Sequence, residues 1–98
     1  MQTGDVPEPD RLEAVRQLYG RVVGFQLRIE KTPQATPHIR QQARALAAPL
    51  EGLNRKLRGR SSSAQLDFVQ ARLLTIQQEL GELFAQQLNP LMESEAEG

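Results

Sequence analysis

Apolar residues spaced three and four apart most strongly constrain the fold of this chain. Residues at these steps lie on one face of an α-helix, because the helix completes a turn about every 3.6 residues. Three separate stretches follow the pattern: Val15, Leu18, Val22, Phe25 and Ile29; Ile39, Ala43, Leu46, Leu50, Leu53 and Leu57; and Leu66, Val69, Leu73, Ile76, Leu80 and Leu83. Each stretch predicts an amphipathic helix, and the alternating steps are those of a coiled-coil seam.

Capping residues mark where these helices should begin. Thr36 precedes Pro37, whose fixed φ suits the first turn of a helix. Ser62 lies three residues before Gln65, which is the spacing of a capping box. Asp10 is the corresponding candidate N-cap for the first helix.

The helices should end near Pro33, Gly59 and Pro90, because glycine and proline are the usual residues just past a helix C-terminus. We therefore expect helices over about residues 10–31, 37–58 and 62–89. Together they form a single domain over residues 10–90. The remaining segments are expected to be a disordered lead-in over residues 1–9 and an acidic disordered tail over residues 91–98.

Pro49 lies inside the second predicted helix, yet the apolar stripe keeps its phase from Ile39 to Leu57. A proline inside a helix removes one hydrogen bond and clashes with the carbonyl four residues earlier, here that of Ala45, at a cost of about 3 kcal/mol. If a separate helix began at Pro49, its apolar residues would not need to stay in phase with those before the proline. The sequence therefore predicts one helix that is kinked near Pro49.

Short connections between the three helices favour antiparallel neighbours. The predicted fold class is all-α, an up-down-up antiparallel three-helix bundle with coiled-coil-like seams. The alternative is an open helical hairpin that completes its core by dimerising. Leu74, Phe84 and Leu88 add apolar surface beside the seam of the third helix and favour a homo-oligomer, with a dimer preferred.

Composition gives little ground for an active site, a metal or a cofactor. The chain has no cysteine and one histidine, so cysteine-based metal sites are excluded and a histidine cluster cannot form. We expect no enzyme activity and no cofactor. No apolar run approaches the roughly 18 residues of a membrane span, and the N-terminus lacks signal-peptide features. The expected compartment is the cytoplasm, without membrane contact.

The charges are unevenly distributed along a chain whose formal net charge is zero. Residues 21–60 hold nine lysines and arginines against two acids, and both flanking segments are acidic. On a helical wheel Arg40, Arg44, Arg55 and Arg58 share the side of the second helix opposite its leucines, and Arg60 follows the helix. These five arginines form a candidate site for an acidic protein surface. The competing interpretation is that cations near a helix C-terminus interact with the helix dipole.

Gly20 and Gly24 form a G-x-x-x-G pattern on the side of the first helix away from its seam. Such spacing lets a second helix approach the backbone closely. The pair is either a tolerated surface feature or a second contact surface for a partner helix.

Taken together, these patterns indicate a non-enzymatic helical module for protein–protein interaction. Adaptor, assembly chaperone and regulatory subunit are all compatible roles. We expect self-association through the third and first helices and docking on a protein partner, acidic in character. The alternative function is a nucleic-acid-associated protein that uses the basic stripe of the second helix.

Overall fold

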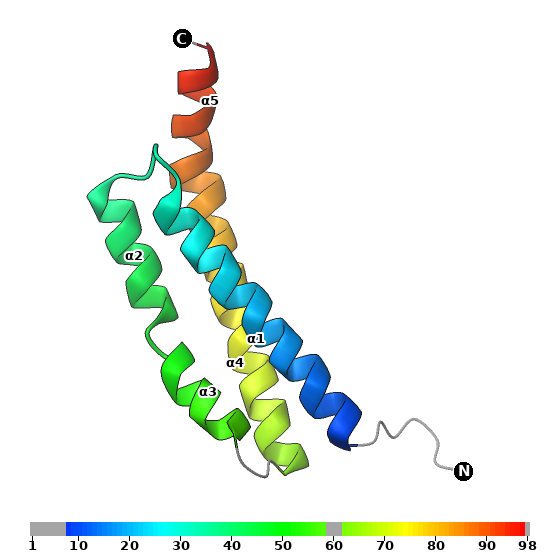
Figure 1. Cartoon of the computed structure of the whole chain (residues 1–98). Helices are drawn as coiled ribbons and strands as arrows, with labels where there is room; N and C mark the ends of the chain where they lie inside the picture. The colour runs from blue at the N-terminus through cyan, green and yellow to red at the C-terminus, as the bar shows by residue number, and fades with distance from the viewer. Residues whose placement is uncertain (1–7, 59–61, 98) are drawn as a thin grey trace.

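The computed structural model describes residues 8–58 and 62–97, in which the regular elements are all helical. In chain order they are α1 (Glu8–Lys31), α2 (Pro37–Ala47), α3 (Leu50–Arg58), α4 (Ser63–Leu83), the π-helical turn η1 (Phe84–Leu88) and α5 (Asn89–Glu97). Figure 1 shows α1 running in one direction, α2 and α3 returning, and α4 to α5 running in the first direction again. The predicted all-α antiparallel three-helix bundle is therefore confirmed.

Two of the three predicted helix starts are confirmed. The Ile39 backbone N–H donates to the Thr36 hydroxyl at 3.1 Å. The Gln65 backbone N–H likewise donates to the Ser62 hydroxyl at 3.1 Å. The prediction that Asp10 caps the start of the first helix is wrong, because α1 begins at Glu8 and Asp10 lies inside it. The predicted stop at Gly59 lies outside the described residues.

The backbone hydrogen bonds around Pro49 explain why the chain bends there. Pro49 has no N–H to offer the Ala45 carbonyl, and the Ala48 N–H donates to that carbonyl instead, at 3.3 Å. Helical bonding resumes when the Leu53 N–H donates to the Pro49 carbonyl at 3.1 Å. Because Leu50 is buried just beyond the bend, the apolar face continues across it. The predicted kinked helix is confirmed, as the pair α2 and α3.

The three predicted stripes form the core between the helices. Every residue of the α4 seam is buried, whereas Phe25 in α1 and Leu46 in α2 are only half-buried at the edge of the core. No polar or charged side chain is buried among the described residues. The core is therefore closed within one chain, without the second copy that an open hairpin would need.

The prediction that Pro90 ends the last helix is wrong. The Asn89 N–H donates to the Phe84 carbonyl five residues earlier, which is the bonding of a π-turn. In a regular helix the Pro90 ring would clash with the Gln86 carbonyl and leave it without a donor. The wider turn just before Pro90 accommodates the proline, and the helix continues.

Residues 91–97 are therefore helical in α5, where we expected a disordered tail. Figure 1 shows α5 projecting beyond the connection between α1 and α2. The predicted lead-in over residues 1–9 lies mostly outside the described residues, and its last two residues belong to α1.

The neighbours Leu73 and Leu74 give a matched test of this core. Leu73 is completely buried, whereas Leu74 is 47% exposed. Leu73→Ala should lower the free energy of unfolding by about 2 to 5 kcal/mol, because it leaves a cavity in the core. Leu74→Ala should lower it by less than about 1 kcal/mol. Urea denaturation followed by circular dichroism measures both, and equal losses would contradict this packing.

Candidate functional site

Two of the candidate arginines are bound to the end of α1. The Arg40 guanidinium donates to the Glu30 backbone carbonyl at 3.0 Å. Arg44 forms an ion pair with the Glu30 carboxylate at 2.8 Å, and the Glu30 side chain is only 13% exposed. Gln26 donates to the other carboxylate oxygen of Glu30. Arg40 and Arg44 therefore join α2 to α1, although the Arg44 side chain remains 69% exposed.

The other members of the arginine stripe are in a different situation. Arg55 and Arg58 are exposed, and neither forms an ion pair with another described residue. Arg60 lies outside the described residues. The ammonium group of Lys56 lies 5.8 Å from the ring centroid of Phe68, so the C-terminal end of α3 places a cation against an aromatic ring of α4. Arg55 and Arg58 therefore present free positive charge at this end of the bundle.

Two cations of α1 form contacts that join α1 to other helices. Arg11 pairs with Asp67 and donates to the Ser63 hydroxyl at 3.0 Å, which ties α1 to the start of α4. Arg16 donates to the Leu57 carbonyl at 2.8 Å. Carbonyls in the last turn of a helix lack helical donors, so this bond satisfies one of them.

The predicted interface residues divide into two groups. Leu88 is fully buried, and Phe84 is half-buried with its ring 6.3 Å from that of Phe25. Leu88 packs in the core, so assigning it to an oligomer interface was wrong, whereas Phe84 lies at the edge of the core and its assignment stays a prediction. The sequence did not reveal the burial of Leu88, because Leu88 reaches the core only through the π-turn. Leu74, Gly20 and Gly24 remain accessible on the surface.

Gly20 and Gly24 lie over a shallow hollow on the outside of α1, flanked by Arg21, Phe25 and Arg28. A Cβ placed on either glycine would meet no atom within 4 Å. The bundle itself therefore does not require glycine at these positions.

The helix α4 carries exposed apolar residues on two flanks. Leu74, on one flank, lines a depression between α4 and α1 together with Arg11, Leu18 and Gln70. Phe68, on the other flank, is 50% exposed beside Lys56 of α3.

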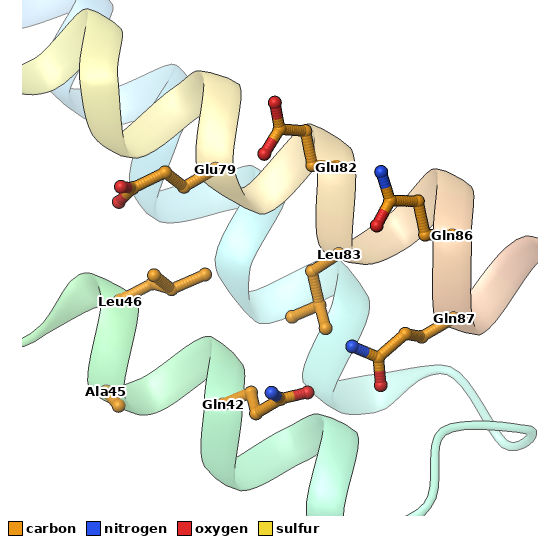
Figure 2. Close-up of a pocket in the computed structure, with 8 residues that line it drawn as sticks. All are labelled: Gln42, Ala45, Leu46, Glu79, Glu82, Leu83, Gln86 and Gln87. Atoms are coloured by element: carbon orange, nitrogen blue, oxygen red, sulfur yellow. The ribbon is translucent and has the colours of Figure 1, made fainter.

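A groove of about 360 Å³ runs between α2 and α4. Figure 2 shows Leu46 and Leu83 reaching into it, with Gln42 and Gln87 at one end. Glu79 and Glu82 line its α4 edge and are exposed. The Gln42 side-chain oxygen is buried there and accepts no hydrogen bond. The groove combines an apolar floor with two carboxylates and several amides.

Sequence reasoning missed this groove. Its lining comes from helices that are far apart in the chain, and most of its members are glutamines and glutamates outside the apolar stripes. The pairs Gln41–Gln42 and Gln86–Gln87 were the available signal.

Within residues 8–58 and 62–97, no three histidine, aspartate or glutamate residues lie close enough to hold a metal ion. None of the described helices combines the length and the apolar character needed to cross a membrane.

Removing Glu30 should show how much the junction of α1 and α2 depends on it. Glu30→Ala deletes the acceptor of Arg44 and Gln26 and should lower the free energy of unfolding by about 1 to 2 kcal/mol. The control Glu79→Ala removes an exposed carboxylate from α4 and should change little. Urea denaturation measures the free energy of unfolding of both variants. A smaller decrease for Glu30→Ala than for Glu79→Ala would contradict a stabilising role of Glu30 at this junction.

Alanine at Gly20 or Gly24 should stabilise the monomer. The added methyl group meets open space, and glycine inside a helix is about 1 kcal/mol less favourable than alanine. We expect Gly20→Ala and Gly24→Ala each to raise the midpoint of thermal unfolding, measured by circular dichroism. A lowered midpoint would mean that the fold itself needs these glycines.

Comparison with models of known protein families, with curated protein sequences and with solved structures finds no match to this chain. The function is therefore argued from its surfaces alone.

Proposed function

We propose that this chain is a non-enzymatic helical module for protein–protein interaction that self-associates through the outer surface of α4, with α1 providing a further contact face. The observation that supports this most directly is that α4 completes the core with one face and still exposes Phe68 and Leu74 on two others. Single exposed apolar residues are common. Here two large ones lie at about half exposure on one helix, and Leu74 also lines a depression between α4 and α1.

Burial of these apolar residues against another helical surface would provide most of the binding free energy. Arg55 and Arg58 would orient an acidic partner surface, since charges at the rim of an interface influence association rate and specificity more than affinity. Adaptor, assembly chaperone and regulatory subunit are the roles that such a module could serve. The compartment that we propose is the cytoplasm.

The nucleic-acid alternative has weaker support. Phosphate binding needs several free cations along one surface. Arg40 and Arg44 both bond to Glu30, which leaves Arg55 and Arg58 as the pair of the described stripe without a bond to another described residue. We therefore favour a protein partner.

Light scattering over a concentration series tests self-association. We expect the average mass to rise from the 11.0 kDa of one chain toward twice that value. The midpoint should fall at about 1 to 100 µM, the range of a small reversible interface. A mass that stays at 11.0 kDa up to several times the upper limit would refute self-association.

A further inference from the structure

The outer face of α4, continued into η1, carries a second series of residues at steps of four and three. Its members are all exposed and are Phe68, Arg72, Thr75, Glu79, Glu82 and Gln86, which we call the outer stripe. Arg72, Glu79 and Glu82 form no ion pair with any described residue. The outer stripe therefore presents one free cation near its start and two free carboxylates further on.

The outer stripe is symmetrical about Gln77. Phe68 and Gln86 are equally far from Gln77 in the chain, and so are Arg72 and Glu82, and Thr75 and Glu79. Two copies of the stripe packed antiparallel would therefore place each Arg72 opposite a Glu82 and each Glu79 opposite a Thr75. A parallel pairing would instead place every charge beside its own copy, which is unfavourable.

We propose that a second copy of this chain docks antiparallel on the outer stripe, across a twofold axis that passes between Thr75 and Glu79, so that each Arg72 pairs with the partner subunit's Glu82 and each Phe68 enters the partner subunit's groove between α2 and α4. This inference rests on the proposed self-association and assigns it to one flank of α4. Because the contact is isologous, both ion pairs and both aromatic insertions form at once.

The groove between α2 and α4 suits a phenyl ring at the place where the symmetry puts it. Gln86, the residue opposite Phe68, lines the groove together with Leu46 and Leu83. Glu82 lines the same groove, so the carboxylate that would receive Arg72 borders the site that would receive Phe68.

The size of the outer stripe sets the strength of the contact. Its 19 positions, from Phe68 to Gln86, span about 27 Å at 1.5 Å per residue. A single helix pair of this length covers less than the roughly 800 Å² per partner of a standard stable interface. We therefore expect a reversible dimer that leaves Leu74 and the two glycines of α1 free for a different partner.

Charge reversal and charge exchange test the proposed pairing. Arg72→Glu and Glu82→Arg should each raise the dissociation constant of the dimer about tenfold, because each puts like charges together twice. The double variant restores opposite charges in exchanged positions and should bind within about threefold of the original chain. Sedimentation velocity at low ionic strength measures the dissociation constants of the two single variants and of the double variant. Circular dichroism confirms that each variant is folded.

Leu74→Ser is the matched control, since it removes an apolar side chain of similar exposure from the other flank of α4. It should leave the dimer unchanged, whereas Phe68→Ser should weaken it about tenfold. A dimer that tolerates Arg72→Glu but is lost in Leu74→Ser would overturn the inference and leave self-association standing. Failure of the double variant to recover binding would also overturn it. If the original chain stays monomeric, both the antiparallel pairing and the proposed self-association are refuted.

Discussion

Burial of the α4 seam is the constraint around which the rest of the molecule is arranged. The seam faces α1 on one side and α2 with α3 on the other, and all of its residues are buried. The polar contacts of α1 follow from this arrangement, since Arg11 reaches α4 and Arg16 reaches the end of α3. These contacts set the alignment of the helices, whereas the hydrophobic effect supplies the main driving force for their packing.

At Pro49 and Pro90 the backbone departs from regular α-helical geometry, and in both places the apolar face stays in the core. At Pro49 the chain tightens, and the Ala48 N–H bonds to a carbonyl three residues earlier. Before Pro90 it widens, and the Asn89 N–H bonds to a carbonyl five residues earlier. A turn closed by an i to i+5 bond returns a residue five positions on toward the same face, so Leu88 follows Leu83 in the core.

The sequence predicted those features that depend on spacing within one segment. The three stripes, the caps at Thr36 and Ser62 and the kink at Pro49 are of this kind. It did not predict the contacts of Glu30 with Arg40 and Arg44, because these depend on how α1 and α2 meet. The outer stripe escaped detection for a different reason. Its steps match those of the seam, but its members are mostly polar, and a search for apolar periodicity passes over them.

The free charges of α4 provide a physical reason for the proposed antiparallel pairing of two chains of zero formal net charge. Internal contacts neutralise Arg44 and Arg11, but the exposed cations of α3 lie beside the start of α4, near Phe68. Exposed carboxylates on the same chain lie further along α4, at Glu79 and Glu82, and in α5, at Glu93. A chain of zero formal net charge has little net charge to keep copies apart. The proposed antiparallel packing would bring each Arg72 against the partner subunit's Glu82, which is the arrangement that the symmetry of the outer stripe selects.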